Sequence, residues 1–268
     1  MSQMLQNKNV GIIGCGWLGR ATAKHFLNKH WEVKGTARSK DTLEGLAKDS
    51  ISAFQYELGA PKEKLQAFFS DLDLLIISVP PGLRQQSGTD YLKKLSRLGE
   101  QIEAGLPKYA RVLFVSSTGV YPQSGGPYCE TSHWKPDSEK SKNLLEAELL
   151  IAQLPFQTCM IRLAGLVGED REPLYSLSKK DSLSGGNKAA NLIHQQDAAR
   201  LLYHLGTVKE LPDLLNGVFP QTIKKGDFYK KKALKLQLPA PKYTDTDKDL
   251  DRHVFSEIAV AFTYENPV

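Results

Sequence analysis

The sequence of 268 residues lacks the features that mark several large classes of protein. Its longest apolar stretch, near residues 72–79, is too short and too interrupted by Asp73 to cross a bilayer. The three cysteines are odd in number, far apart and without metal-ligand spacing, which favours a reduced compartment and no metal site. No apolar signal core precedes the first predicted strand, so a cytoplasmic location without membrane attachment is expected.

Neither sign of charge dominates the composition. The 35 Lys and Arg residues exceed the 30 Asp and Glu residues by a net charge of +5. This mild excess suits a small anionic ligand but is too small to indicate nucleic acid. Hydrophobic residues at 41% and charged residues at 24% are ordinary for a globular chain, and repeats and low-complexity tracts are lacking.

Short apolar runs alternate with helical patterns through the first part of the chain. Strands alternating with helices imply parallel pairing, so the sequence predicts an α/β fold with a Rossmann-type doubly wound parallel sheet over residues 1–165. Residues 166–268 are predicted to form a smaller mixed substrate lobe, with a helix at 191–205 packing back on the Rossmann domain. Strands are predicted at 10–14, 31–37, 51–58, 72–79, 111–116 and 158–163, and helices at 18–29, 42–48, 62–69, 91–104 and 143–153.

A glycine-rich turn follows the first predicted strand, where residues 14–19 read Gly-Cys-Gly-Trp-Leu-Gly. Gly14 allows a tight turn, Gly16 allows the backbone to approach a pyrophosphate, and Gly19 allows close helix–strand packing. The start of the next helix, at Trp17 and Leu18, presents free N–H groups to phosphates. The alternative is a glycine turn without a ligand, which the agreement of strand, spacing and helix disfavours.

The end of the second predicted strand indicates which dinucleotide is bound. An NAD site usually carries an acidic residue there, but residues 36–40 read Thr-Ala-Arg-Ser-Lys. Arg38 can form a fork onto a 2′-phosphate, and Ser39 can donate to it, so NADP is expected in preference to NAD. The alternative is that Arg38 is a solvated surface residue.

Two further strand ends are candidates for the cofactor site because of their position alone. Leu58 ends the third predicted strand, where a backbone amide could meet the adenine. Ser78, Val79 and Pro80 end the fourth strand in a rigid turn that continues through residues 81–82. Ordinary loop chemistry is the alternative for both segments.

Three further segments and the glycine turn resemble one known family. The chain is similar to atypical extended short-chain dehydrogenase/reductases, in the NAD-dependent epimerase/dehydratase family that acts on nucleotide sugars. The resemblance covers at least residues 9–218 and implies a Rossmann domain, a substrate lobe and a homodimer. Its segments read Val-Ser-Ser-Thr-Gly-Val-Tyr-Pro (115–122), Ile-Arg-Leu-Ala-Gly-Leu-Val-Gly (161–168) and Ile-His-Gln-Gln-Asp-Ala-Ala (193–199).

The chemistry of that family needs a Tyr-x-x-x-Lys pair and a Ser or Thr after the fifth strand. Ser117 matches the Ser/Thr position, but Lys140 stands at the tyrosine position and Leu144 at the lysine position. A phenol titrates near 10, so a nearby ammonium is needed for proton transfer near neutral pH. Ser117 and Tyr121 are therefore the catalytic candidates of a degenerate site.

Several residues have two interpretations that the sequence leaves open. Tyr121 or Tyr128 could approach Lys140 or Lys142 and substitute for the missing pair, or Tyr121 could pack under the loop. Arg162 could meet a substrate anion or pair with an acid in the core. His194 is expected to pack or cap a helix, and the lysine run at 224–235 to form a solvated helix face rather than a site for an anionic partner.

Two hypotheses of function follow. In the first, the protein is an NADP-dependent oxidoreductase or epimerase that acts on a small anionic substrate such as a nucleotide sugar. In the second, it is a non-catalytic NADP(H)-binding sensor or regulatory protein. Nucleic-acid binding through the lysine run is poorly supported by the charge distribution.

Overall fold

The computed structural model describes residues 8–61, 64–80, 88–168, 171, 173–221, 223–244, 252–260 and 264. Within these residues, seven parallel strands form the central sheet in the order β3-β2-β1-β4-β5-β6-β9. The strand order reverses between β1 and β4, which is where doubly wound sheets bind ligands. The strands are β1 (Asn9–Ile13), β2 (Glu32–Ala37), β3 (Ser52–Gln55), β4 (Leu74–Ile77), β5 (Arg111–Ser117), β6 (Gln157–Leu163) and β9 (Leu214–Gly217).

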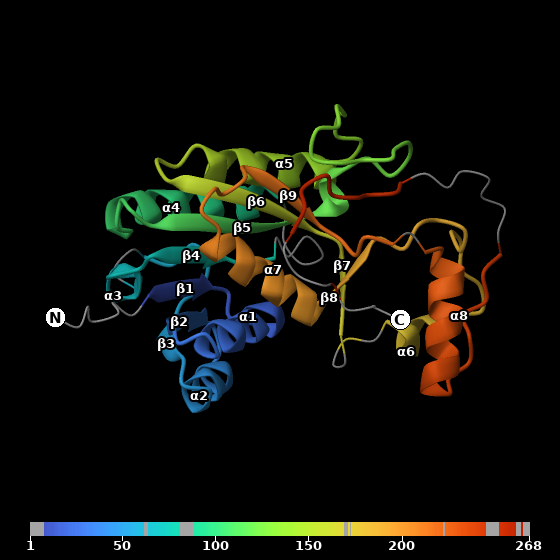
Figure 1. Cartoon of the computed structure of the whole chain (residues 1–268), viewed down its shortest axis with the longest axis horizontal. Coiled ribbons are helices and arrows are strands. Elements are labelled where there is room, and N and C mark those ends of the chain that lie inside the picture. Colours follow the sequence, from blue (N-terminus) through green and yellow to red (C-terminus); the bar gives the residue numbers. More distant parts are fainter. Residues whose placement is uncertain are drawn as a thin grey trace.

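Helices cover both faces of this sheet (Figure 1). Successive strand residues point to opposite faces, so Ile12 joins the core beneath α1 and α7, whereas Ile13 joins the core beneath α4 and α5. This two-sided burial confirms the predicted α/β doubly wound fold. The helices are α1 (Trp17–Leu27), α2 (Lys40–Lys48), α3 (Gln66–Phe69), α4 (Gly88–Gly105), α5 (Glu139–Ala152) and α7 (Gln195–Thr207), with the 3₁₀ turn η2 (Thr118–Val120) directly after β5.

A smaller group of elements lies beyond the end of the sheet (Figure 1). The strands β7 (Gly165–Val167) and β8 (Leu192–His194) pair in parallel, and the helices α6 (Leu174–Leu177) and α8 (Lys225–Leu236) follow on this side. Val167, Ala190 and Phe228 form a small hydrophobic core of their own. The predicted division of the chain after residue 165 stays a prediction.

The second part of the chain differs from the sequence-based expectation at two places. The expected helix at 191–205 is wrong at its start, because Leu192–His194 form β8 and the Nδ1 atom of His194 caps α7 by accepting from Gln196 N at 3.3 Å. The strand β9 joins the main sheet although residues 166–268 were assigned to the smaller lobe. The lysine run at 224–235, for which a helix face was expected, does include a helix, α8. Residues 62–63 of one predicted helix lie outside the described residues.

Candidate functional site

The glycine turn lies at the switch point of the sheet. Gly14 has a left-handed backbone angle (φ +86°), and a Cβ atom there would lie 2.6 Å from the carbonyl oxygen of Ser78 at the end of β4. Both the conformation and the close approach therefore require glycine. The amides of Gly14 and Cys15 donate to the Thr36 hydroxyl (3.0 Å) and carbonyl (2.8 Å), which fixes the turn against β2.

The first turn of α1 has no side-chain cap on its amide groups. The first hydrogen bond of this helix runs from Arg20 N to Gly16 O at 2.7 Å. The amides of Trp17, Leu18 and Gly19, which precede Arg20, therefore have no acceptor within the helix. A Cβ atom at Gly16 would meet nothing within 4 Å, so an open space lies beside these amides. Free amides, the helix dipole and open space together fit a pyrophosphate.

Trp17 and Leu18 have different surroundings in this first turn. Leu18 is buried in the core beneath α1 and α7. Trp17 is half-buried, its carbonyl accepts from Gln195 Nε2 at 2.8 Å, and the guanidinium of Arg171 lies 4.6 Å from the centre of its ring. The sequence analysis missed this contact, by which Trp17 joins the glycine turn to the start of α7.

The end of β2 places one basic and one acidic side chain together. Arg38 is 76% exposed, and its Nη1 atom lies 3.8 Å from Oε1 of Glu57, which follows β3. The Ser39 hydroxyl caps α2 by accepting from Thr42 N at 3.4 Å. The sequence analysis did not consider Glu57, because this carboxylate is reached only through the pairing of β2 with β3. A guanidinium at this position favours a dinucleotide with a 2′-phosphate, whereas a carboxylate favours one with a free ribose hydroxyl.

The ends of β3 and β4 form other parts of the same sheet edge. Ser78 N donates to Ile13 O at 2.8 Å, and Val79 Cγ1 would lie 2.8 Å from a Cβ at Gly14, so both residues adjoin the glycine turn. Pro80 follows them and is exposed. Leu58 lies beyond β3, two strands from β1, and packs against the core beneath α4. Residues 81–82 of the predicted turn lie outside the described residues.

Ser117 ends β5 beside β4, so it lies on the same edge of the sheet as Ser78. Its hydroxyl accepts from Gly119 N at 3.0 Å and thereby caps the short η2 turn. Ser117 is half-buried, and the side chains of Lys140 and Leu144 from α5 approach the same turn. The structure therefore brings Ser117 together with the two positions at which the resembled family has its Tyr and Lys.

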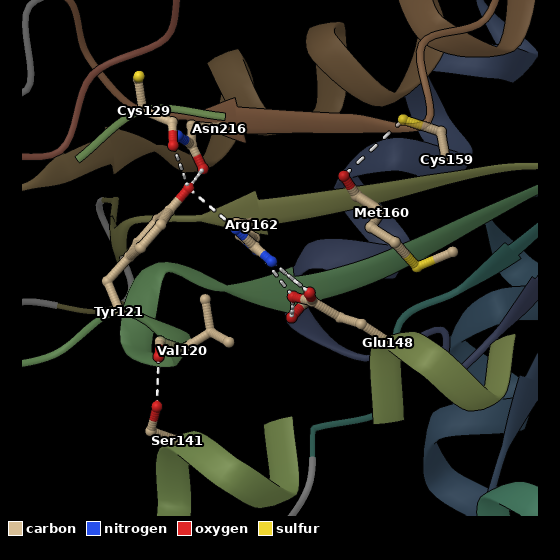
Figure 2. Close-up of polar contacts among 10 residues, drawn as sticks. Val120, Tyr121, Cys129, Ser141, Glu148, Cys159, Met160, Arg162 and Asn216 are labelled. Carbon is tan, nitrogen blue, oxygen red and sulfur yellow. Dashed lines mark hydrogen bonds and ion pairs between the residues drawn. The ribbon is translucent and has the colours of Figure 1, made fainter. Parts of the chain in front are cut away.

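Tyr121 belongs to a buried polar network beneath the turn that holds Ser117 (Figure 2). It is 0% exposed, and its hydroxyl donates toward Cys129 O (3.1 Å) and Asn216 Oδ1 (3.0 Å). Burial raises the pKa of Tyr121, against the opposing effect of Arg162, so the phenol stays neutral near pH 7. The Tyr128 hydroxyl donates to Ser124 O at 2.7 Å. Neither tyrosine hydroxyl makes a described contact with Ser117 or with a lysine.

Arg162 pairs with an acid in the core, which decides between its two interpretations. It is 6% exposed, and its Nε and Nη2 atoms donate to the two carboxylate oxygens of Glu148 at 3.0 and 2.7 Å. Its Nη1 donates to the Tyr121 hydroxyl at 3.0 Å (Figure 2). Burial lowers the pKa of Arg162, but the hydrogen bonds and charge of Glu148 outweigh it, and the net pKa is raised. This bidentate pair joins α5 to β6 beneath the site.

Arg252 contacts the turn after β5, and Lys225 lies within range of the charges of Arg252 and Lys188. Arg252 Nη2 donates to Thr118 O, next to Ser117, and its Nε is buried without an acceptor among the described residues. Desolvation lowers the pKa of Lys225, although its side chain reaches solvent, and the charges of Arg252 and Lys188 lower it further. An anionic ligand would relieve this repulsion. In the sequence, Lys225 is one member of a run of lysines, and no motif marks Arg252.

The part of the chain that the structure describes shows neither a metal site nor a membrane-crossing helix. Its His, Cys, Asp and Glu side chains form no group of three that could hold a metal ion. Its helices include none with both the length and the apolar character needed to cross a bilayer.

Comparison with known proteins agrees with the geometry of the glycine turn. Residues 9–97 match the family model of the NAD-binding domain of 6-phosphogluconate dehydrogenase. This segment runs from β1 into α4 and holds the glycine turn, Arg38 and the end of β4. The N-terminal part of the chain is therefore an NAD-binding Rossmann domain.

Similarity to individual proteins extends over nearly the whole chain. Protein YeeZ of Escherichia coli K12 is 27% identical over 272 residues, which cover 97% of this chain and 98% of YeeZ. A functionally unknown conserved protein from Silicibacter pomeroyi has a TM-score of 0.78 and 21% identity, covering 97% of this chain and 95% of that one. MoeE5 in complex with UDP-glucuronic acid and NAD has a TM-score of 0.74 and 17% identity, covering 96% and 94%. At these identities the solved structures establish the shared fold.

Proposed function

We propose that this protein is an NADP-dependent oxidoreductase or epimerase that acts on a small anionic substrate such as a nucleotide sugar. The observation that carries the proposal is the uncapped first turn of α1 beside the open space at Gly16, at the switch point of the sheet. Ser117 on the same sheet edge and Arg252 at Thr118 support a substrate next to the dinucleotide. MoeE5, which shares the fold, binds UDP-glucuronic acid and NAD.

Different residues at the sheet edge would bind different parts of the dinucleotide. The amides of Trp17, Leu18 and Gly19 in the first turn of α1 would hold the pyrophosphate, and Gly14 and Gly16 would shape the turn beside it. Arg38 and Ser39 would hold the 2′-phosphate, with Leu58 beside the adenine and Ser78, Val79 and Pro80 along the nicotinamide half. When bound, the nicotinamide supplies hydride transfer. The chain's own contribution is to orient the bound molecules and to stabilise charge on the reacting oxygen.

Ser117 and Tyr121 would contribute in different ways. The Ser117 hydroxyl, at the end of β5, would donate to the reacting oxygen of the substrate. The Tyr121 hydroxyl is held by Arg162, Cys129 and Asn216, and these contacts support a positioning role beneath the turn. Lys225 and Arg252 would bind the anionic part of the substrate. The homodimer and the cytoplasmic location that the sequence suggests remain predictions.

The cofactor preference is tested by the variant Arg38→Asp. Loss of a charged contact to the 2′-phosphate should weaken NADPH binding about thirtyfold, while NADH binding changes little, because NADH lacks that phosphate. Titration calorimetry with both dinucleotides measures the two affinities. Arg97→Asp, an exposed arginine on α4, is the matched control. Equal loss of both affinities, or no loss of either, would refute the role of Arg38.

The second candidate function is a non-catalytic dinucleotide sensor. It is favoured by Leu144 at the expected lysine position and by the two tyrosine hydroxyls bonded away from Ser117. The deciding experiment measures dinucleotide binding by calorimetry and NADPH consumption over carbonyl compounds and nucleotide sugars in parallel. Turnover of any of these compounds supports the enzyme. Dinucleotide binding without turnover of any compound supports the sensor. If none of NAD, NADH, NADP and NADPH binds at millimolar concentration, both candidates fail.

A further inference from the structure

Three side chains converge on one point at the turn after β5. A Cβ atom built on Gly119 would lie 3.2 Å from Ser117 Oγ, 3.4 Å from Leu144 Cδ1 and 3.5 Å from Lys140 Cε. The aliphatic stem of Lys140 therefore reaches the turn that Ser117 caps, and its Cε atom and the serine Oγ atom lie close to the same point at Gly119. The absence of a side chain at residue 119 leaves the space in which the serine and the lysine approach each other.

The position of α5 fixes this approach. The Ser138 hydroxyl caps α5, and the buried Ser141 hydroxyl donates to Val120 O, which joins the first turn of the helix to η2 (Figure 2). Residues four apart share one helix face, so Lys140 and Leu144 both face the turn that holds Ser117. Lys142 lies on another face and pairs with the exposed Glu139 at 2.9 Å.

Within the described part of the chain, Lys140 has no acidic partner. Its side chain is exposed on the sheet edge that carries the proposed dinucleotide site, because β5 is the direct neighbour of β4. A lysine ammonium offers three N–H donors on a flexible stem, so it can follow an oxygen atom placed between itself and Ser117.

We propose that Lys140 is the proton-transfer residue of the site and that it acts on the substrate oxygen that Ser117 also contacts. The inference rests on the proposed function. In a reduction, Lys140 gives a proton to the carbonyl oxygen as the hydride of the reduced nicotinamide dinucleotide enters the carbonyl carbon. The carbonyl is reduced to an alcohol, the dinucleotide is oxidised, and the neutral amine regains a proton from water. Oxidation runs the same transfers in reverse, with the neutral amine as the base.

Amine labelling provides a test that does not depend on turnover. The protein is treated with an acetylating reagent with and without NADPH, and the modification of each lysine is followed by mass spectrometry. With NADPH at about ten times its Kd, labelling of Lys140 should slow about tenfold because the occupied site shields it. Lys142 is the matched control and should be labelled at an unchanged rate. Equal labelling of Lys140 in both samples, while calorimetry shows NADPH bound, overturns the inference and leaves the proposed function standing.

Substitution provides the second test. Lys140→Met keeps the aliphatic stem and removes the ammonium, so kcat on any substrate found should fall about a hundredfold or more, while the Kd for NADPH changes less than about twofold. Lys142→Met should leave both values unchanged. Full turnover by Lys140→Met overturns the inference. If the unaltered protein binds no dinucleotide, the proposed function is wrong, and so is the proposed role of Lys140.

Discussion

Gly16→Leu is expected to abolish dinucleotide binding and to leave the protein folded. A Cβ at residue 16 meets nothing within 4 Å, so the leucine side chain extends into the space proposed for the pyrophosphate rather than into the protein. Blocking contact between the phosphates and the α1 amides should weaken binding at least about a hundredfold, or about 2.7 kcal/mol. Titration calorimetry measures this loss, and thermal unfolding should show a Tm within about 2 °C of the unaltered protein.

Two other glycines serve as comparisons for this variant. A Cβ at Gly19 would lie 2.6 Å from Gly14 O, so Gly19→Ala should lower stability as well as binding. Gly99→Ala, within α4, introduces only an ordinary contact with Leu154 at 3.5 Å and should change neither property. Undiminished binding by Gly16→Leu would show that the first turn of α1 does not hold the dinucleotide.

Glu148→Ala is expected to cost about 3–5 kcal/mol of the free energy of unfolding, because it leaves the buried Arg162 guanidinium without its counter-ion. Glu148 is 4% exposed and accepts from Arg162 and, at 2.5 Å, from the Ser116 hydroxyl. Its removal also frees Arg162 from the geometry that holds the Tyr121 hydroxyl. Denaturant unfolding measured by circular dichroism gives the change in free energy.

A control and a rescue separate this effect from a general loss of helix stability. Glu146→Ala, on the exposed face of the same helix, should change the free energy of unfolding by less than about 0.5 kcal/mol. The double variant Glu148→Leu with Arg162→Met replaces the ion pair by apolar groups of similar size and should recover most of the lost stability. If the single variant unfolds as the unaltered protein does, the ion pair contributes nothing to stability.

The sequence predicted those parts of the site that depend on residues close together in the chain. The glycine spacing, the strand before it and the helix after it lie within about one βαβ unit and follow from backbone geometry alone. The same holds for Ser117 at the end of β5 and for the capping role of His194. The expected helix over 191–205 began too early because a three-residue strand such as β8 carries almost no periodic signal.

The contacts that the sequence did not predict join residues distant in the chain. Glu57 reaches Arg38 only because β2 and β3 are paired. Arg252 reaches Thr118 across 134 positions. Lys225 is one of several lysines in a run. Lys230 and Lys231 of the same helix, α8, line a surface hollow to which Lys225 does not contribute. The lysine run in the sequence did not indicate which of its lysines lies within range of the charge of Arg252.

The sequence by itself determined the doubly wound sheet and the position of the glycine turn, because periodic burial and the requirement for glycine at a tight turn are local properties of the chain. The tertiary structure alone decided that Arg162 pairs with Glu148, that the Tyr121 hydroxyl is buried and that Lys140 faces Ser117. Such contacts depend on how α5, β5, β6 and β9 are packed together, and a side chain's partner is set by the element opposite it rather than by its neighbours in the chain.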